Sequence, residues 1–174
     1  WKDKGFENYY LSVNISPRDI YLMDVGRYLK DLVLKYDVSP KNLKLEITET
    51  MISDAKRCID LIQQLQEYGF VVEMDDFGSG YSSLNTLKNI PVDILKMDMG
   101  FLRESVDTKK GEEILSFVVE LSKKLNIGCI AEGIETKEQL DFLMKCGCDT
   151  FQGYYFSRPI PVYEYEEKYM KKQG

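Results

Sequence analysis

The sequence predicts an α/β protein that forms a (β/α)8 barrel of the TIM type, incomplete here, with about six of the eight strands represented. Strand-like apolar stretches alternate with amphipathic helical stretches along the whole chain. A polar residue stands near the carboxyl end of every expected strand, and these positions follow at intervals of about 20 to 36 residues, the length of a βα unit. They are Asn14, Glu46, Asp75 with Asp76, Lys96 with Asp98, Glu132 and Gln152. Polar groups gathered at this end of parallel strands are typical of the catalytic face of such a barrel.

A doubly wound open sheet is the competing architecture. It would place its ligand site in a crevice at one switch point, whereas every strand expected here ends in a polar residue. A complete barrel has eight strands and about 250 residues, so two strands are expected to be missing on the amino-terminal side. The strands that carry Asn14 and Gln152 should then be the two edges of the sheet. Residues 1–174 alone should be inactive and prone to self-association.

The first strand is expected over residues 10–15, and a helix follows it. Ser16 resembles an N-cap, Pro17 fits the first helical position, and Asp19 places a negative charge in the first turn. Apolar residues then recur at helical spacing over residues 22–36. The pattern predicts one helix from Pro17 onwards.

The second strand is expected over residues 43–48, where alternation places the apolar residues on one face and Glu46 on the other. The next helix is capped by Asp54 and closed by Gly69. The third strand, residues 70–74, ends directly before two aspartates.

The fourth strand is expected over residues 94–98, with Lys96 and Asp98 on a common face, after a short helical piece over residues 84–88. An amphipathic helix is expected over residues 112–125. Its inward residues should be Ile114, Leu115, Val118, Leu121 and Leu125.

The fifth strand is expected over residues 126–134. Thr136 should cap the following helix, because Gln139 three residues later completes a capping box. A sixth strand is expected over residues 149–156, and residues 162–174 form a terminal helix or tail.

The stretch from residue 70 to residue 83 carries the strongest chemical signal. Asp75 and Asp76 bring two negative charges into a confined space, which is costly unless cations or donors offset them. Gly78 and Gly80 permit positive φ and close backbone approach, so the loop can fold over whatever the aspartates hold. Oxygen ligands suit Mg²⁺ or Mn²⁺ rather than zinc. Taken alone, the stretch is equally compatible with a surface turn after an ordinary strand.

Composition excludes several classes of function. Hydrophobic residues at 44% and charged residues at 30% are typical of a globular protein. The net charge of −6 argues against binding to DNA or RNA backbones, so metal ions would have to mediate contact with a phosphorylated ligand. No apolar run approaches the roughly 20 residues of a membrane helix.

The chain has no histidine, which excludes histidine-dependent triads and histidine-ligated zinc among these residues. The cysteines are Cys58, Cys129, Cys146 and Cys148. Their spacing fits no metal site beyond one Cys-x-Cys, so reduced core thiols are expected. This favours a cytoplasmic protein, or the cytoplasmic domain of a larger, membrane-bound one.

Six ordered motifs make the chain resemble the EAL-domain phosphodiesterases of bacterial cyclic di-GMP signalling. They are Val13-Asn14-Ile15-Ser16, Leu45-Glu46-Ile47-Thr48-Glu49, Asp75-Asp76-Phe77-Gly78-Ser79-Gly80-Tyr81-Ser82-Ser83, Leu95-Lys96-Met97-Asp98, Ala131-Glu132-Gly133-Ile134-Glu135-Thr136 and Gln152-Gly153-Tyr154. The resemblance covers essentially the whole chain. The Glu-x-Leu motif of the family, with its metal-binding glutamate and nearby phosphate-binding arginine, is absent and is expected upstream of Trp1. Residues 1–174 are therefore expected to be a truncated EAL domain, about its carboxyl-terminal three quarters.

The resemblance implies a site for two Mg²⁺ or Mn²⁺ ions. It implies Asn14, Glu46, Asp75 and Glu132 as direct metal ligands and Asp76 as the residue that serves the second metal. Two cations could stabilise both the attacking and the leaving oxygen of an in-line phosphoryl displacement.

Three residues are implied in catalysis: Lys96, Glu46 and Asp98. Lys96 would orient or deprotonate the attacking water, and Asp98 would hold Lys96 through their shared strand face. Carboxylates around Lys96 should raise its pKa, which favours positioning over base chemistry.

The groups implied for substrate binding are Gln152, Asp76 and Tyr154. Glu49 is implied as the anchor of the loop that contains Gly78 and Gly80, which in this family couples metal binding to dimer contacts. The implied partners are cyclic di-GMP, a second copy of the chain, and a sensor or GGDEF domain in the full-length protein.

The leading hypothesis is hydrolysis of cyclic di-GMP to linear pGpG. A non-catalytic EAL-type cyclic di-GMP receptor or interaction module is the alternative, motivated by the missing Glu-x-Leu segment. A Schiff-base enzyme that uses Lys96 is a third hypothesis and requires a suppressed lysine pKa. Single residues also have structural interpretations: Asn14 could help to cap a helix, Lys96 and Asp98 could form a structural ion pair, and Tyr154 could pack.

Overall fold

The six strands of the protein form one parallel sheet in sequence order. The computed structural model describes residues 1–48, 51, 55–78, 84–98, 100 and 109–170. Within these residues the strand order is β1-β2-β3-β4-β5-β6, and each strand is parallel to its neighbours. The strands are β1 (Leu11–Asn14), β2 (Leu43–Thr48), β3 (Val71–Phe77), β4 (Ile94–Met97), β5 (Gly128–Ala131) and β6 (Thr150–Phe151). Helices alternate with these strands, so the fold is an incomplete (β/α) barrel, as predicted.

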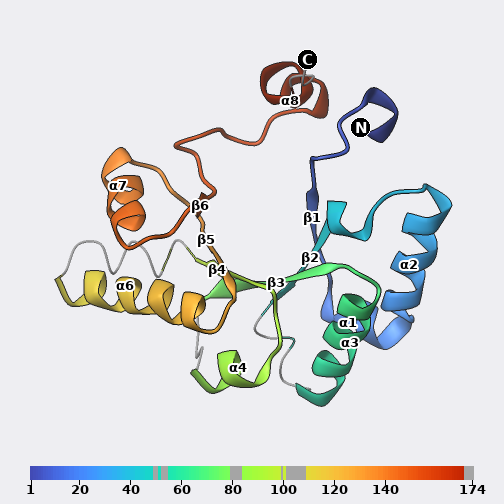
Figure 1. Ribbon diagram of the computed structural model, residues 1–174, viewed down its shortest axis with the longest axis horizontal. Helices are drawn as coiled ribbons and strands as arrows, with labels where there is room; N and C mark the ends of the chain where they lie inside the picture. The colour runs from blue at the N-terminus through green and yellow to red at the C-terminus, as the bar shows by residue number, and fades with distance from the viewer. Residues whose placement is uncertain (49–50, 52–54, 79–83, 99, 101–108, 171–174) are drawn as a thin grey trace.

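The helices between the strands lie around the outer side of the curved sheet, and the last helix, α8, lies on its open side near the N-terminus (Figure 1). They are α1 (Pro17–Leu22), α2 (Val25–Lys35), α3 (Ala55–Glu67), α4 (Leu84–Asn89), α6 (Lys109–Lys124), α7 (Lys137–Lys145) and α8 (Val162–Tyr169). Two short 3₁₀ helices, η1 (Lys2–Lys4) and η2 (Pro40–Asn42), precede β1 and β2. Within the described residues, none of the helices has the length and apolar composition needed to cross a membrane.

The two edges of the sheet are β1 and β6, as expected from the strands that carry Asn14 and Gln152. The chain ends meet on the side of the sheet between these edges (Figure 1). There the Trp1 ring stacks on Tyr165 with centroids 5.9 Å apart, and its indole N–H donates to Glu166 Oε1 at 2.8 Å. Lys4 forms an ion pair with the same glutamate. Elements from opposite ends of the sequence thus hold one another at the open side.

The hydrophobic core lies between the sheet and its outer helices. Alternation along each strand sends one set of side chains into this layer. On β2, β3 and β4 the fully buried members of this set are Leu45, Ile47, Val72, Met74, Leu95 and Met97. From α3 and α6 they meet Ile62, Leu65, Leu115 and Val119. The opposite face of each strand is therefore left for the polar side chains.

The helix predicted from Pro17 onwards is two helices. It starts as predicted, with Ser16 and Asp19 forming a capping box. It ends at Leu22, because the Asp24 side chain accepts from the backbone N–H of Arg27 and caps a new helix, α2. The apolar spacing that suggested one helix continues across this break.

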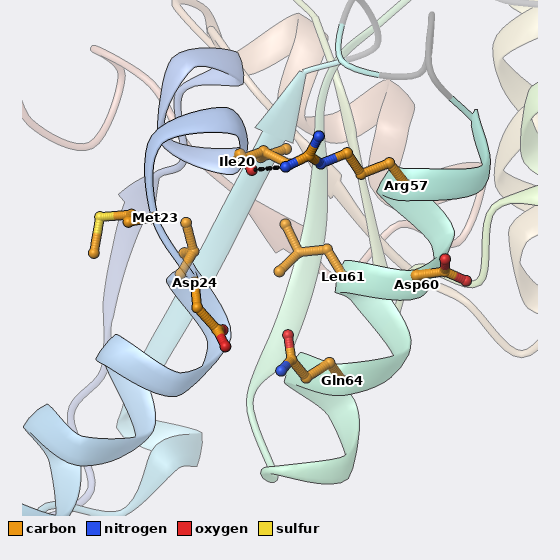
Figure 2. Close-up of a pocket in the computed structure, with 8 residues that line it drawn as sticks. Ile20, Met23, Asp24, Arg57, Asp60, Leu61 and Gln64 are labelled. Atoms are coloured by element: carbon orange, nitrogen blue, oxygen red, sulfur yellow. Dashed lines mark hydrogen bonds between the residues drawn. The ribbon is translucent and has the colours of Figure 1, made fainter.

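The break lets α1 and α2 wrap around α3 (Figure 2). Arg57 of α3 donates to the carbonyl oxygen of Ile20 at 2.8 Å and so satisfies an acceptor near the end of α1. Gly26 of α2 approaches Gln64 of α3 so closely that a Cβ at this position would lie 2.4 Å from Gln64 Oε1. The pocket in Figure 2 lies among these residues, in the helical layer.

The predicted inward face of α6 is partly wrong. Leu115 and Val118 are buried and Leu121 is half-buried, but Ile114 and Leu125 are 41% and 46% exposed. The helix buries a narrower stripe that also includes Gly111 and Ser122. Ile114 falls on the flank of that stripe, and Leu125 lies one residue beyond the end of the helix at Lys124.

Candidate active site

Lys96 on β4 gathers three carboxylates from three other strands. Its Nζ lies 2.7 Å from Glu46 Oε1 on β2, 3.1 Å from Asp75 Oδ1 on β3, and 3.0 Å from Glu132 Oε1 directly after β5. The Lys96 side chain is almost fully buried, and the three carboxylates are largely buried. Residues spread over nearly half of the sequence therefore form one compact charged cluster.

The strand pattern explains why these residues meet. Each lies on the face opposite the buried core residues, as Glu46 does between Leu45 and Ile47. Each also lies at or just beyond the carboxyl half of its strand, and in a parallel sheet these ends share one edge. The cluster thus occupies the catalytic end of the barrel, inside the curve of the sheet.

The charges of the cluster do not balance. One ammonium faces three carboxylates, which leaves a surplus of negative charge in a buried place. Burial alone would lower the pKa of Lys96, but hydrogen bonds to Glu46 and Glu132 outweigh it and hold this pKa well above the ordinary lysine value. Lys96 is therefore a charged donor at neutral pH. This disfavours the Schiff-base hypothesis, which needs a suppressed lysine pKa.

Glu132 shows the cost of the surplus charge most clearly. Burial, together with the nearby Asp75, raises the pKa of Glu132 to about 7, although its hydrogen bond to Lys96 acts in the opposite direction. A second positive charge nearby, in addition to that of Lys96, would therefore stabilise the ionised form of Glu132.

A β-bulge sets the direction of the two adjacent aspartates. β3 runs through Asp75 and Asp76 to Phe77, whereas the sequence pattern predicted its end at Met74. The pairing register with β4 shifts between Met74 and Phe77, and Asp76 has a positive φ of 59°. Bulges of this kind redirect side chains beside active sites. Burial and the charges of Asp75 and Asp98 raise the pKa of Asp76.

Asp98 does not hold Lys96, contrary to the expectation from a shared strand face. β4 ends at Met97, one residue before Asp98. The Asp98 carboxylate instead accepts from the backbone N–H of Gly100 at 2.6 Å. Because the chain leaves the strand at this point, alternation no longer fixes the direction of the side chain.

Asn14 lies at the rim of the cluster, at the last position of β1 and directly opposite Glu46 in the pairing register. Its backbone is held by the neighbouring ladder bond, in which the Ile15 N–H donates to the Glu46 carbonyl oxygen at 2.8 Å. The Asn14 residue is exposed. It does not cap the following helix, because Ser16 does.

Gln152 follows β6 and is tied to the loop that carries Glu132. Its N–H donates to the Ala131 carbonyl oxygen at 2.9 Å, and its own carbonyl oxygen accepts from the Ile134 N–H at 3.0 Å. The residue is exposed. Tyr154 is 57% exposed, and the Arg158 guanidinium lies over its ring at 5.3 Å. Tyr154 is thus not part of the buried cluster.

Two of the three loop-anchoring residues lie outside the described residues: Glu49 and Gly80. Gly78 is described, directly after β3, with a positive φ of 98° that favours glycine. The rest of the turn expected after the two aspartates lies outside the described residues.

A second polar layer, which the sequence analysis did not identify, lies below the cluster. Glu73 on β3 is fully buried and contacts Ser12 on β1 and Lys44 on β2. The sequence did contain a signal for this layer: Glu73 stands inside an otherwise apolar strand, two positions before Asp75. A buried glutamate needs polar partners, so its position indicates a second polar layer.

The cluster fits a divalent cation by chemistry and charge. Its donors are oxygens, which Mg²⁺ and Mn²⁺ prefer, and its surplus negative charge favours a cation. The carboxylates converge on Lys96 rather than on a shared metal position. Among the described residues, no group of three or more acidic or cysteine side chains is already arranged to hold a metal ion.

The sequence matches a known family over most of its length. A family model described as the EAL domain matches residues 1–159. The bifunctional diguanylate cyclase/cyclic di-GMP phosphodiesterase MucR of Pseudomonas aeruginosa is 36% identical over 163 residues, which cover 93% of this chain and 24% of MucR. The cyclic di-GMP phosphodiesterase PdeR of Escherichia coli is 33% identical over 172 residues, 98% of this chain and 26% of PdeR. The chain thus spans about a quarter of the length of these relatives.

Solved structures share the fold. The PaMucR phosphodiesterase in a c-di-GMP complex superposes with a TM-score of 0.85 at 34% identity, covering 94% of this chain and 67% of that one. The manganese and cyclic di-GMP complex of Klebsiella pneumoniae BlrP1 at pH 6 has a TM-score of 0.80 at 32% identity, covering 86% and 39% of the two chains.

Proposed function

The chain belongs to the EAL domain family, and from this premise we propose that the protein hydrolyses cyclic di-GMP to the linear dinucleotide pGpG with Mg²⁺ or Mn²⁺. The observation that carries the proposal is the convergence of Glu46, Asp75 and Glu132 on Lys96 at the carboxyl ends of the strands. The names of similar proteins support the substrate: MucR and PdeR are called cyclic di-GMP phosphodiesterases, and BlrP1 was solved with manganese and cyclic di-GMP.

In this proposal the acidic side chains hold the cations. Asn14, Glu46, Asp75 and Glu132 bind one divalent ion, and Asp76 serves a second. When bound, two such ions stabilise the charge on the attacking and leaving oxygens of an in-line displacement. The negative surplus of the cluster and the raised pKa of Glu132 support this role, because both favour an added cation.

Lys96 positions the nucleophilic water in this proposal. Its raised pKa keeps it protonated, so it donates hydrogen bonds and does not accept a proton from the water. The three carboxylates hold Nζ at the centre of the cluster. A carboxylate that turned from Lys96 to a cation would free an N–H of Lys96 for the water. The Asp98 carboxylate accepts from the Gly100 N–H and has no hydrogen bond or ion pair with Lys96 among the described residues.

The exposed polar groups around the cluster bind the substrate in this proposal. Gln152 and Asp76 hydrogen-bond the ligand at the rim, and the accessible ring of Tyr154 offers a surface on which a guanine can stack. Glu49, Gly78 and Gly80 anchor the loop beyond Asp76.

The test is product analysis with the full-length protein. With Mn²⁺ present, cyclic di-GMP should be converted to pGpG, and Glu46→Gln should abolish the conversion because it removes a ligand and a Lys96 partner. Glu120→Gln is the matched control, since Glu120 is exposed on α6 and pairs only with Lys124 among the described residues. Normal turnover by Glu46→Gln would contradict the proposal.

The same samples test the receptor alternative. Calorimetry that shows micromolar cyclic di-GMP binding in the wild type, with no pGpG formed, would establish a non-catalytic receptor. We also propose that the full-length protein is a homodimer and carries a sensor or GGDEF domain. The chain spans only about a quarter of MucR and PdeR, which leaves room for such domains. Light scattering on the full-length protein tests the dimer.

A further inference from the structure

A polar cluster around the buried Glu73 joins the first three strands below the candidate active site. Ser12 Oγ on β1 donates to Glu73 Oε2 on β3 at 3.0 Å. Lys44 Nζ on β2 lies 3.1 Å from the other oxygen, Glu73 Oε1, and 3.8 Å from the centroid of the Tyr10 ring. Glu73 Oε2 thus accepts a hydrogen bond from β1, whereas Oε1 lies within ion-pair distance of Lys44 on β2 and has no hydrogen-bond partner among the described residues.

Each member of this cluster stands two residues before a candidate metal ligand on the same strand. The pairs are Ser12 with Asn14, Lys44 with Glu46, and Glu73 with Asp75. Residues two apart on a strand point to the same face, so the cluster forms a layer directly beneath the ligands. Such layers of side chains are how the interior of a (β/α) barrel is filled.

β1 has little support from its own strand pairing or burial. It is an edge strand that pairs only with β2, and all four of its residues are exposed. Apolar burial therefore contributes little to its position. The Ser12–Glu73 hydrogen bond reaches across β2 and ties β1 to β3, which is a central strand.

We propose that Glu73 is a positioning residue for the metal site: through Ser12 it holds β1 so that the Asn14 amide stays opposite Glu46. Lys44 balances the charge of Glu73 through its ion pair with Oε1. Glu73 touches neither the metal nor the substrate. The inference rests on the proposed function, because Asn14 is a ligand only in that proposal.

A Mn²⁺ titration of the full-length protein tests the inference. Ser12→Ala should weaken Mn²⁺ affinity about tenfold, as loss of an outer-shell partner does. Ser12→Thr keeps the hydroxyl and should retain the wild-type affinity. The double variant Ser12→Ala/Asn14→Ala should bind Mn²⁺ as tightly as Asn14→Ala alone. Ser12 acts only by placing the Asn14 amide, so its loss has no further effect once that amide is gone. An unchanged affinity in Ser12→Ala, or strictly additive losses in the double variant, would overturn the inference.

Hydrogen exchange in the metal-free protein separates this inference from the proposed function. Ser12→Ala should speed exchange of the Ile15 amide, which bonds the Glu46 carbonyl oxygen, relative to the Leu140 amide in α7. Ser157→Ala removes an exposed hydroxyl that bonds Arg158 and should leave both amides unchanged. If the wild type binds no Mn²⁺, the proposed function fails, but the exchange rate of the Ile15 amide still tests the inference. An unchanged rate in Ser12→Ala would show that Glu73 does not support β1.

Discussion

Lys96 illustrates how one residue can determine the chemistry of a whole site. Three carboxylates from three strands lie within hydrogen-bonding distance of its Nζ, and all four side chains are largely shielded from water. Without a cation, Lys96 is the only positive charge that contacts these carboxylates among the described residues. Its removal should therefore affect folding and metal binding in opposite directions.

Lys96→Met tests this expectation. In the metal-free protein the variant should lose ~3–5 kcal/mol of unfolding free energy, because three buried carboxylates lose their partner. Added Mn²⁺ should restore more stability in the variant than it adds to the wild type, since the ion replaces the lost charge. Urea denaturation with and without Mn²⁺ measures both effects. The exposed pair of Lys124 with Glu120 supplies the control, and Lys124→Met should cost less than ~1 kcal/mol.

Glu132 predicts a pH dependence of stability. Burial raises the pKa of Glu132 from 4.5 to about 7. Between these values the folded protein binds a proton that the unfolded chain has released, so the unfolding free energy of metal-free protein should fall as pH rises through this window. The fall should be at most ~3 kcal/mol.

Denaturation of EDTA-treated protein from about pH 5 to about pH 8 measures this slope. Asp76 also has a raised pKa and adds to the slope in the same direction. Glu132→Gln isolates the contribution of Glu132, because glutamine does not titrate. Equal slopes for the wild type and Glu132→Gln would show that Glu132 has an ordinary pKa.

At the scale of elements, the connection between β5 and β6 shows how backbone packing places a ligand. The Ile134 N–H donates to the Gln152 carbonyl oxygen, and the Ile134 carbonyl oxygen accepts from the Tyr155 N–H. Gly153 lies between the two residues that bond Ile134, and a Cβ at Gly153 would stand 2.2 Å from the Ile134 carbonyl oxygen. Only glycine fits, because the atoms it meets are backbone.

Gly153→Ala should therefore separate the two loops and displace Glu132, which is two residues from Ile134. We expect a loss of ~2 kcal/mol or more in stability and a marked loss of Mn²⁺ affinity. Gly26→Ala is the matched control, because its Cβ would also overlap a neighbour, at 2.4 Å, but this neighbour is the flexible end of Gln64. In α2 the alanine should be neutral or stabilising by up to ~1 kcal/mol. Equal effects of the two changes would refute the backbone argument.

At the scale of the whole molecule, the open edge of the sheet is the dominant feature. β1 is an edge strand, and its outward apolar side chains Leu11 and Val13 are 52% and 45% exposed. An exposed apolar edge strand is a template for pairing with another chain. The contacts between η1 and α8 lie beside this edge but leave Leu11 and Val13 accessible.

Residues 1–174 expressed alone should therefore self-associate. Light scattering should report oligomers or aggregates at micromolar concentration, and Val13→Lys should reduce them, since a charge on an edge strand opposes pairing. Tyr21→Lys adds the same charge away from the sheet, at a more exposed site on α1, and should change the self-association little. A monodisperse wild-type fragment would contradict this prediction.

The sequence by itself determined the fold class and the set of strands. Its signals are local: alternation along β2, the capping box at Thr136 and Gln139, and a polar residue at each strand end can all be detected within a few residues. Parallel strands in sequence order then bring these ends to one edge, which is why Glu46, Asp75, Lys96 and Glu132 could be grouped before the structure was known.

Only the tertiary structure decided the partners of each side chain. Asp98 turned to Gly100 because β4 ends one residue early, and the bulge in β3 redirected Asp76. The role of Glu73 depends on Ser12, which is 61 residues away in sequence. Hydrogen bonds and ion pairs of this kind depend on distances of a few ångströms between strands. Periodicity along one strand fixes the face on which a side chain lies, but the packing of three strands against one another fixes what it touches.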